Sequence, residues 1–477
     1  MRSALKFVCV LLLPVFLAGN AIAAQRPNIL FLFSDDQRFD TIHALGNEHI
    51  RTPNLDRLAQ SGTAFTRAYI MGGNSGAVCM PSRAMLMSGR SLFRINNHLK
   101  GQTTWPEKFS RAGYLTFMTG KWHNGAESVH RAFLSGNAIF LGGMGSPYKL
   151  PLQDIDPDHE FANKRVSGEH SVKLFADAAI QFLKQEKNGR PFLCYAAFNC
   201  PHDPRMAPQS YHDYYNAHKP PLPKNYLPVH PFNNSEMTIR DEQLAPWPRT
   251  TEVVRQHLAD YYAYIHFMDD QIGRILDTLK ATGQFENTII VFSSDNGLAI
   301  GSHGLFGKQN LYDHATHMPL IFTGPGIPAG QQRDAFCYLF DIFPTLAELV
   351  GGVAAPDGNE GKSLAPVIAG KTATHRDSIF TAYRHIHRAV RDDRWKLIAY
   401  TQINKTQLFD LQADPAETND LAADPSRAGE VARLTGLLKD WQQKCGDEQP
   451  LTTAKPVPLE FDFRKIKISK RPTSGVE

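Results

Sequence analysis

The sequence of 477 residues predicts an α/β fold, in which a large, mainly parallel sheet is flanked by helices and followed by a smaller C-terminal α+β domain. Three observations lead to this prediction. Continuous apolar runs occur at residues 28–33, 191–198 and 288–292, a long amphipathic pattern precedes the third run, and short strand-like segments follow residue 376. Apolar runs without polar alternation are typical of strands buried on both faces, and their alternation with helices indicates parallel pairing.

The N-terminal residues 1–24 have the pattern of a secretory signal peptide. Arg2 and Lys6 supply positive charge, an apolar run extends from Val8 to Leu17, and small residues suited to cleavage follow. The run is too short to span a membrane, and no later run reaches the necessary length. We therefore expect an exported bacterial protein, periplasmic or secreted, with no integral membrane segment in the mature chain. The formal net charge of +4 gives no reason to expect nucleic acid as a partner.

Each apolar run ends in polar residues. The first leads into Asp35 and Asp36, the second into His202, and the third into Asp295 and Asn296. In an open parallel sheet, ligands bind beyond the carboxyl ends of the strands. The sequence therefore predicts a functional site at this edge of the sheet.

Helices are expected between the strands. One should begin at Pro53, with Thr52 as its cap, and stop at Gly62. Another has apolar residues at three- and four-residue steps from Val254 to Leu279. The segment between residues 211 and 248 is rich in Pro, His and Asn, and we expect a long surface loop there.

A change of composition divides the chain near residue 376. Glycines and prolines between residues 351 and 370 suggest connecting loops, and short strand-like segments lie beyond them. The expected divisions are a signal peptide at residues 1–24, a main domain at 25–375 and a small C-terminal subdomain at 376–477.

Two clusters of hard oxygen ligands end the first and third runs. Asp35, Asp36, Asp295 and Asn296 could serve separately as a helix cap and a turn. If they meet at one edge of the sheet, adjacent carboxylates repel each other unless a cation lies between them, which favours Ca²⁺ or Mg²⁺. No cysteine or histidine spacing in the sequence suits zinc.

Cys79 lies close to the expected start of a helix. Pro81 suits a first turn, and Arg83 follows one turn further on. The cysteine could be a buried structural residue, half of a disulfide, a metal ligand or a reactive centre. A thiol at a helix N-terminus should have a lowered pKa. Five cysteines remain beyond the signal peptide, so at least one is unpaired, and pairing of Cys194 with Cys200 stays open.

Four basic residues lie in loops where their roles depend on the fold. Lys121 and His123 share one Gly-rich segment, His202 follows a proline, and Lys308 follows a glycine. Each could be an ordinary surface residue. If they converge with Arg83 on the start of one helix, they would neutralise a tetrahedral anionic ester and supply general acid–base groups.

The segment Cys79-Met-Pro-Ser-Arg83, followed by Met87-Ser-Gly-Arg90, resembles the C-x-P-S-R…T-G-R motif of type I, formylglycine-dependent sulfatases, which belong to the alkaline-phosphatase-like superfamily. Ser88 replaces the commoner threonine and keeps a hydroxyl. Further segments resemble the family in the same order across residues 27–425: residues 27–36, 119–123, 201–202, 294–297, 304–312 and 395–411.

The resemblance implies an alkaline-phosphatase-like fold, with the catalytic domain at residues 25–375 and a C-terminal subdomain that completes the active-site cleft. It implies that Cys79 is oxidised during export to Cα-formylglycine by a formylglycine-generating or anaerobic sulfatase-maturating enzyme. One hydroxyl of the hydrated aldehyde would attack sulfur and displace the alcohol, and the second would then expel sulfate. One Ca²⁺, in preference to Mg²⁺, would be held by the four oxygen ligands Asp35, Asp36, Asp295 and Asn296.

The resemblance also implies a role for each basic residue. Arg83 would orient the diol, Lys121 and Lys308 would hold sulfate oxygens, His123 would assist proton removal, and His202 would act as general acid. Export and a basic, His-rich surround favour a sulfated polysaccharide or oligosaccharide as substrate. The candidates for contacts with sugar hydroxyls or uronate carboxylates are His98, Arg205, His303 and Arg384.

Two alternatives remain from the sequence. Some relatives that share the aldehyde motif hydrolyse phosphonate monoesters or phosphodiesters, so the chain could do the same. A non-catalytic glycan-binding protein is the second alternative, and it would keep Cys79 unmodified.

Overall fold

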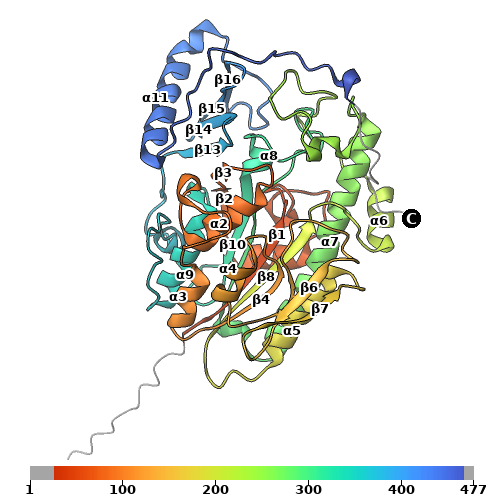
Figure 1. The fold of residues 1–477 in the computed structure, drawn as a ribbon, viewed down its shortest axis with the longest axis vertical. Coiled ribbons are helices and arrows are strands. Elements are labelled where there is room, and N and C mark those ends of the chain that lie inside the picture. The colour runs from red at the N-terminus through yellow and green to blue at the C-terminus, as the bar shows by residue number, and fades with distance from the viewer. Residues whose placement is uncertain (1–25, 467–477) are drawn as a thin grey trace, which may run out of the picture.

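A computed structural model of the protein describes residues 26–466, and its main part is an 11-stranded mixed sheet (Figure 1). The strands follow the order β11-β2-β10-β9-β1-β8-β4-β5-β6-β7, and β12 pairs with β2. Their bounds are β1 (Asn28–Asp35), β2 (Gly62–Tyr69), β4 (Leu115–Lys121), β5 (Ser135–Phe140), β6 (Pro151–Ile155), β7 (Phe161–Val166), β8 (Phe192–Pro201), β9 (Thr288–Ser294), β10 (His317–Thr323), β11 (Gln331–Arg333) and β12 (Cys337–Tyr338).

The three apolar runs form the centre of this sheet as the strands β9, β1 and β8. β1 pairs in parallel with both neighbours, so that Ile29 lies opposite Leu193 on one side and Ile289 on the other. Every residue of β1 is buried. The prediction of buried, parallel strands is confirmed. The structure adds that the three are neighbours, with their carboxyl ends at one edge.

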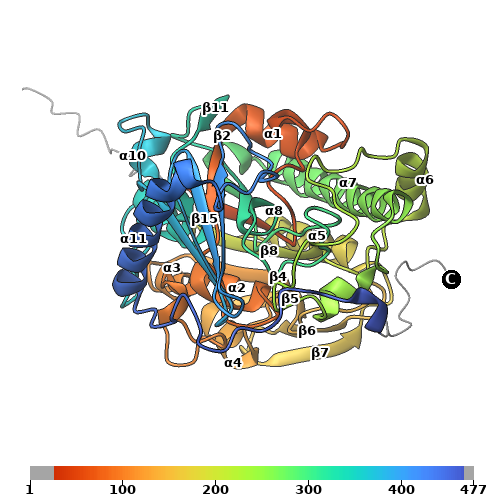
Figure 2. The same ribbon diagram turned by 90° about the horizontal axis from the view of Figure 1, so that it is seen from above.

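Helices cover both faces of the sheet, because alternate side chains of β1 enter two separate cores. Ile29, Phe31 and Phe33 belong to one core, and Leu30 and Leu32 belong to the other. Figure 2 shows the two helical layers with the strands between them. The first core is covered by α2 (Cys79–Ser88), α3 (Trp105–Arg111), α4 (Ala126–Ala132) and α9 (Ile342–Val350), and the second by α1 (Pro53–Ser61), α5 (Ser171–Lys184) and α7 (Thr251–Ala281).

The helix α1 begins at Pro53 as predicted, but the prediction of Thr52 as its cap is wrong. The Thr52 hydroxyl makes no hydrogen bond to the first amides of α1. Asp269 of α7 supplies the cap instead, because its carboxylate accepts from the backbone N–H groups of Asn54 at 3.0 Å and Leu55 at 2.8 Å. The acceptor comes from a helix more than two hundred residues away, which spacing along the chain cannot reveal.

The segment between residues 211 and 248 is the predicted loop only in part: residues 218–239 form no helix or strand, but its two ends are partly helical. It includes most of the helix α6 (Gln209–Ala217) and a 3-10 turn at Arg240–Leu244. Tyr211 and Tyr215, one turn apart, pack on the α7 side of α6, where Tyr215 is fully buried. Burial of two aromatic side chains on one helical face is more favourable in free energy than their exposure on a solvated loop.

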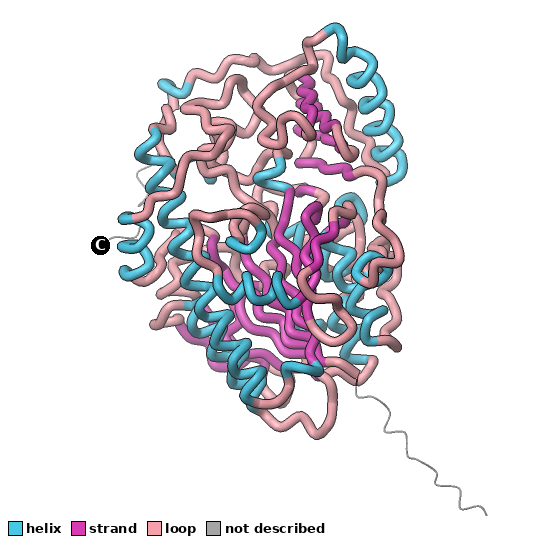
Figure 3. The backbone as a smooth tube through the Cα atoms, turned by 180° about the vertical axis from the view of Figure 1, so that it is seen from behind, coloured by secondary structure: helices cyan, strands magenta, loops and turns pink. Residues whose placement is uncertain are grey.

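A second sheet lies beside the first (Figure 3). Its order is β16 (Lys405–Asp410), β15 (Trp395–Tyr400), β14 (His387–Arg391), β13 (Ile379–Tyr383) and β3 (Gly72–Gly73), and α11 (Ala428–Cys445) packs against it. The short helices α8 (Asp313–Thr316) and α10 (Ala365–Ile368) complete the α-helices of the described residues. Because β3 belongs to the segment that leads to Cys79, the C-terminal sheet contains a strand from the N-terminal part of the chain.

The predicted signal peptide at residues 1–24 lies outside the described residues. Within residues 26–466, no helix combines the length and apolar character needed to cross a membrane.

Candidate active site

Cys79 is the first residue of α2 and is almost fully buried. Pro81 occupies the first turn, and Gly89 ends the helix with a left-handed φ of 71°. These features confirm the predicted helix start. The five cysteines in the described part of the chain are free and buried, so Cys194 and Cys200 of β8 do not form a disulfide in this structure.

Two lysine ammonium groups lie beside Cys79. The Lys121 Nζ, at the end of β4, is 3.5 Å from the Cys79 Sγ, and the Lys308 Nζ is 3.6 Å from it. Lys121 also donates to Asp35 Oδ2 at 2.6 Å, and Lys308 donates to both oxygens of Asp36 at 2.6 and 2.9 Å. Two cations therefore converge on the start of α2 from separate segments of the chain.

Arg83 lies one turn into α2 and points back toward the same centre. Its Nε donates to Asp295 Oδ2 at 2.8 Å, and its Nη1 donates to the Lys121 carbonyl at 2.9 Å. The guanidinium thereby joins the helix to the ends of β4 and β9. Its Nη2 is buried and has no protein partner among the described residues, although Asp35 Oδ1 is 4.0 Å away.

The four predicted oxygen ligands meet at the ends of β1 and β9. The Asp36 amide donates to Asp295 Oδ1 at 3.0 Å, and the Asn296 amide nitrogen donates to Asp36 Oδ1. Asp35 Oδ1 and Asn296 Oδ1 are buried acceptors without a protein partner in the described chain. Buried acceptors of this kind need a donor or a cation. The donor set, made entirely of carboxylate and amide oxygens, fits a hard divalent cation such as Ca²⁺.

The structure also places Cys79 and His202 with Asp36, within 4.8 Å of one another, and Cys79 with Asp35 and Asp295 within the same limit. A group of sulfur, nitrogen and oxygen ligands is of the kind that zinc accepts. The tertiary structure thus assembles a Cys/His/Asp group that sequence spacing did not reveal. Its sulfur ligand exists only while residue 79 remains a thiol.

Charges in this buried centre shift the pKa values of its acids in opposite directions. Burial, and then the negative charge of Asp295, raise the pKa of Asp35 to about 6. Burial also opposes ionisation of Asp295, but the positive charges of Arg83, Lys121 and Lys308 outweigh it and lower its pKa to about 2. A divalent cation beside Asp35 would stabilise its ionised form in the same way.

The pKa of the Cys79 thiol does not follow the expectation for a helix N-terminus. Burial raises it to about 11, although Lys121 and Lys308 act in the opposite direction. The expectation of a lowered pKa is wrong because desolvation of the thiolate outweighs the nearby positive charges. The unmodified side chain would therefore be a poor nucleophile at neutral pH.

Two histidines flank the centre. The His202 Nε2 lies 3.7 Å from Asp36 Oδ2, and its Nδ1 lies 2.8 Å from the Asp203 carbonyl. His123 has a left-handed φ of 71°, uncommon for a residue other than glycine. Burial, and then the charges of Lys121 and Arg83, lower the pKa of His123 to about 2, so it is a neutral imidazole. His123 packs closely against Gly143. A larger residue at position 143 would clash with it, because a Cβ there would lie 2.4 Å from the His123 Nε2.

A network that the sequence analysis missed supports His202. The Asp203 carboxylate lies 3.4 Å from His202 Nδ1 and is held by both terminal nitrogens of Arg240. Arg240 also pairs with Asp241 at 2.9 Å, and Asp241 accepts from Gln309, the neighbour of Lys308. Asp203 and Gln309 could have been found as sequence neighbours of predicted residues. Arg240 could not, because it lies in the segment predicted as a surface loop.

The four candidates for sugar contacts lie in different environments. His303 is buried and stacks on Tyr312 with ring centroids 3.8 Å apart, and Arg205 is buried beside His257. His98 is exposed on the surface, and Arg384 is exposed in the turn between β13 and β14. Burial leaves His303 and Arg205 poorly placed to meet a sugar, whereas Arg384 is accessible.

Comparison with known proteins agrees with this geometry. The sulfatase family model matches residues 27–353, and the model of the N-sulphoglucosamine sulphohydrolase C-terminal region matches residues 301–444. The chain is 28% identical to an N-acetylglucosamine-6-O-sulfatase of Bacteroides thetaiotaomicron over 508 residues, covering 89% of this chain and 88% of that protein. It is also 28% identical to a Delta 4,5-hexuronate-2-O-sulfatase of the same bacterium over 490 residues, covering 96% and 94%.

A solved structure of a protein in complex with its substrate D-glucosamine-2-N,6-O-disulfate is similar to most of this chain. The TM-score is 0.76 at 26% identity, and the match covers 89% of this chain and 99% of that one. Because the family model spans most of the chain and the large mixed sheet is that of the structural relatives, this protein belongs to the sulfatase family of the alkaline-phosphatase-like superfamily and is a sulfate ester hydrolase.

Proposed function

We propose that this protein removes sulfate esters from a sulfated polysaccharide or oligosaccharide, with Cα-formylglycine at position 79 as its nucleophile. The observation that carries this proposal is the convergence of Lys121 and Lys308 within 3.6 Å of the Cys79 Sγ at the start of a helix. A sulfate group presents tetrahedrally arranged oxygens, which such donors and a helix N-terminus bind well.

The charge balance of the buried centre accommodates a divalent cation when the anionic substrate is also bound. The carboxylates of Asp35, Asp36 and Asp295 are matched by the positive charges of Lys121, Lys308 and Arg83. A divalent ion adds two positive charges, and a sulfate monoester with an ionised diol adds two negative ones. We assign the ion as Ca²⁺, in preference to Mg²⁺, because the protein supplies several oxygen ligands. When bound, it would polarise the sulfate oxygens and favour ionisation of the diol.

The side chains around residue 79 divide the reaction between them. The hydrated aldehyde offers one hydroxyl to attack sulfur and a second whose deprotonation releases sulfate and restores the aldehyde. Lys121 and Lys308 would donate to sulfate oxygens, and Arg83 would hold the diol. His123 would accept the proton of the second hydroxyl once the negative charge of the bound sulfate offsets the charges of Lys121 and Arg83, which together with burial lower its pKa. His202 would protonate the departing alcohol.

The substrate class and the cellular location extend this proposal. The relatives act on N-acetylglucosamine 6-sulfate and on unsaturated hexuronate 2-sulfate, which makes glycosaminoglycan-like sugars the first substrates to test.

Residues 1–24 would direct export to the periplasm or beyond, and a formylglycine-generating or anaerobic sulfatase-maturating enzyme would modify Cys79. Residues 25–375 would form the catalytic domain, and residues 376–477 would complete its cleft.

Mass spectrometry of the peptide that contains residue 79 tests the nucleophile. Protein purified from its native host should carry the aldehyde at this position. An intact thiol there would overturn the proposal and would favour a glycan-binding protein without catalysis.

Paired substrates test the reaction. The protein should hydrolyse 4-nitrophenyl sulfate with a higher kcat/KM than bis(4-nitrophenyl) phosphate or an aryl phosphonate monoester. A clear preference for the diester or the phosphonate would make the chain a phosphonate monoester or phosphodiester hydrolase of the same superfamily. Absence of turnover with all three substrates by aldehyde-bearing protein would contradict both assignments.

A further inference from the structure

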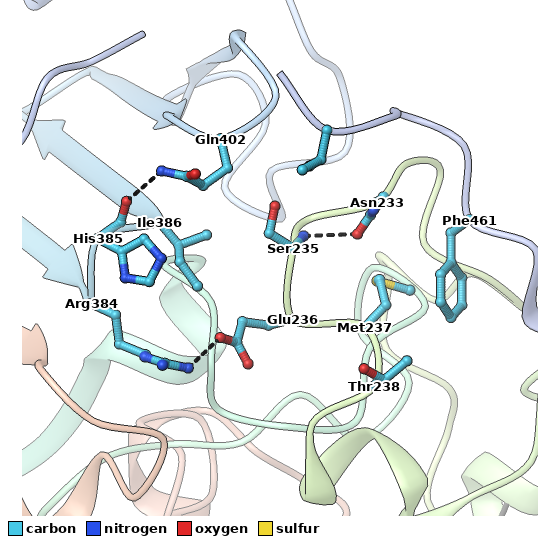
Figure 4. A pocket seen from close by; sticks show the side chains of 11 residues that line it. Asn233, Ser235, Glu236, Met237, Thr238, Arg384, His385, Ile386, Gln402 and Phe461 are labelled. Carbon is cyan, nitrogen blue, oxygen red and sulfur yellow. Dashed lines mark hydrogen bonds and ion pairs between the residues drawn. The ribbon is translucent and has the colours of Figure 1, made fainter. Parts of the chain in front are cut away.

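A cavity of about 480 Å³ opens between the loop of residues 233–238 and the turn of residues 384–386 (Figure 4). The turn joins β13 to β14, and Val457 and Phe461 of the C-terminal segment form a further part of the wall. The volume lies in the range typical of small-molecule sites. We call this cavity the Arg384 pocket.

The Arg384 pocket borders the segment that leads to Cys79. The Arg384 amide donates to the Gly73 carbonyl at 2.7 Å, and a Cβ on Gly76 would lie 3.1 Å from the side chain of Ile239, which follows the pocket residue Thr238. Because Gly76 precedes Cys79 by only three residues, their Cα atoms lie within about 11 Å. The pocket is thus near enough to hold part of a substrate whose sulfate lies at residue 79.

A second hollow adjoins the pocket at Arg384. Its volume is about 530 Å³, it shares Arg384 and His385 with the first, and it reaches Asn74. The two hollows are therefore neighbours, and each has a volume typical of a small-molecule site.

The polar groups of the pocket form a donor–acceptor pair. The Arg384 Nη1 donates to Glu236 Oε1 at 2.7 Å, and Figure 4 shows the two side chains pointing toward one another. The guanidinium supplies N–H donors, whereas the carboxylate only accepts. Neighbouring hydroxyls of a sugar ring match this pair, since one can accept from Arg384 while the other donates to Glu236. A carboxylate ligand can only accept, and it would lie against the negative charge of Glu236.

The pair is more than a surface ion pair. The Arg384 side chain is 39% exposed, but the Glu236 side chain is only 9% exposed, and burial raises the pKa of that carboxyl. Arg384 and Ser235, on opposite walls, have left-handed φ values of 45° and 70° although neither is glycine. Strained backbone on both walls is a feature that clusters at ligand sites.

Ile386, Met237 and Phe461 give the same cavity an apolar part. A pyranose ring has an apolar face of C–H groups and an edge of hydroxyls, which suits a pocket with this division. We propose that the Arg384 pocket binds an uncharged, hydroxyl-bearing sugar ring of the sulfated substrate, through Arg384 and Glu236. The assignment rests on the proposed sulfatase function, and it selects an N-acetylated amino sugar or a neutral sugar over a uronate.

Three variants test the pocket: Arg384→Ala, Glu236→Gln and the control Arg394→Ala. The control removes an ion pair with matching properties, because Arg394 pairs with Asp410 at 2.7 Å, with 49% and 9% of the side chains exposed, outside the pocket. The kcat/KM of each is measured with N-acetylglucosamine 6-sulfate, with unsaturated hexuronate 2-sulfate and with 4-nitrophenyl sulfate, and thermal unfolding monitors the fold.

The wild-type protein should prefer N-acetylglucosamine 6-sulfate to the hexuronate. Arg384→Ala should lower the ratio of kcat/KM on this sugar to that on 4-nitrophenyl sulfate by about tenfold, and Arg394→Ala should leave it unchanged. Glu236→Gln should raise KM for the sugar, since a hydroxyl loses its charged acceptor.

Other results would reject the pocket assignment. A lower KM in Glu236→Gln would point to a carboxylate ligand. If Arg384→Ala and Arg394→Ala had the same ratio of kcat/KM on the sugar to that on 4-nitrophenyl sulfate, the pocket would not bind substrate. Wild-type protein that hydrolyses 4-nitrophenyl sulfate but neither sugar would reject this pocket assignment while leaving the sulfatase reaction intact. Failure on every sulfate ester would instead reject the proposed function.

Discussion

Residue 79 is the first residue of α2 and also the proposed nucleophile of the active site. Its side chain contacts two ammonium groups, yet burial keeps the unmodified thiol protonated. The two ammonium groups would stabilise an anion bound at this position, but the protonated thiol itself is a poor nucleophile. Conversion to an aldehyde hydrate would resolve this conflict, because the reacting group then becomes a hydroxyl.

Replacement of Cys79 by Ala should lower kcat by at least about a thousandfold, because the nucleophile is lost. The side chain is small, so the melting temperature should change little. Steady-state kinetics with 4-nitrophenyl sulfate and calorimetry check the two expectations. A matched replacement of Cys194, buried near the start of β8 and far from its carboxyl end, should retain activity. Full turnover by Cys79→Ala would contradict the role of this residue.

Gly143 makes room for His123, so Gly143→Ala should displace that imidazole. The added Cβ would lie 2.4 Å from Nε2, and a displacement of this order can lower kcat/KM by about a hundredfold. Gly429→Ala is the control, because nothing lies within 4 Å of its Cβ. Both variants should fold, and only Gly143→Ala should lose activity. The same kcat/KM in both variants would show that the position of the His123 imidazole does not matter for activity.

Removal of divalent ions should abolish turnover, because buried carboxylates would lose the cation that supports the reacting groups. Dialysis against EDTA followed by Ca²⁺ addition should restore activity, and Ca²⁺ should raise the melting temperature by binding the folded state. Asp295→Asn should lose this thermal shift, whereas Asp393→Asn, at an exposed surface position, should keep it. Full activity of metal-free protein would contradict the cation site.

At the scale of elements, caps and strand ends position the site. The cap of α1 comes from Asp269 of α7, and it fixes α1 against the long helix behind the central strands. Asp269→Ala should lower the free energy of unfolding by about 2 kcal/mol, since two helix amides lose their acceptor. Asp277→Ala on the same helix removes only an exposed pair at 3.7 Å and should have little effect. Chemical denaturation measures both.

The contribution of Asp269 should depend on pH. Burial raises its pKa to about 7 in the folded protein, well above the ordinary value of an aspartate side chain. Between about pH 4 and pH 7 the folded state therefore binds more protons than the unfolded chain, and the free energy of unfolding falls as the pH rises. The stability difference between wild type and Asp269→Ala should accordingly shrink from pH 4 to pH 7. A difference that grows over this range would contradict the assignment.

At the scale of the whole molecule, a buried ion network joins the two sheets. Lys396 of β15 lies 2.7 Å from Asp313 and 2.6 Å from Glu417, and Arg391 of β14 lies 2.9 Å from Asp313. Asp313 begins α8, and its Oδ2 also accepts from Tyr69 of β2. The C-terminal sheet is therefore tied to the main sheet by charge as well as by β3.

Because of this network, the protein should unfold in one cooperative transition. Lys396→Met should lower the free energy of unfolding by about 3 kcal/mol, since Asp313 and Glu417 lose a buried partner. Lys405→Met breaks a partly exposed pair with Asp420 at 3.5 Å and should cost far less. Scanning calorimetry tests both, and a separate early transition in the wild type would contradict the coupling.

Much of the fold was evident from the sequence, because its signals are local. Continuous apolar runs predicted β1, β8 and β9, and a proline followed by a glycine stop predicted α2 with Cys79 at its start. Polar residues that follow buried strands indicated where the ligands would gather. These patterns depend on neighbours within a few positions, and they were sufficient for the fold class and for the acidic cluster.

Tertiary structure alone decided the properties that depend on distant residues. Four features depend on segments far apart in the chain. They are the pairing of each lysine with its aspartate, the burial that raises the pKa of Cys79, the cap from Asp269 and the support of His202 by Arg240. Desolvation and ion pairing are set by every group packed around an atom. The sequence by itself therefore determined which groups are available to this site, and packing determined their charges, their partners and the pocket beside them.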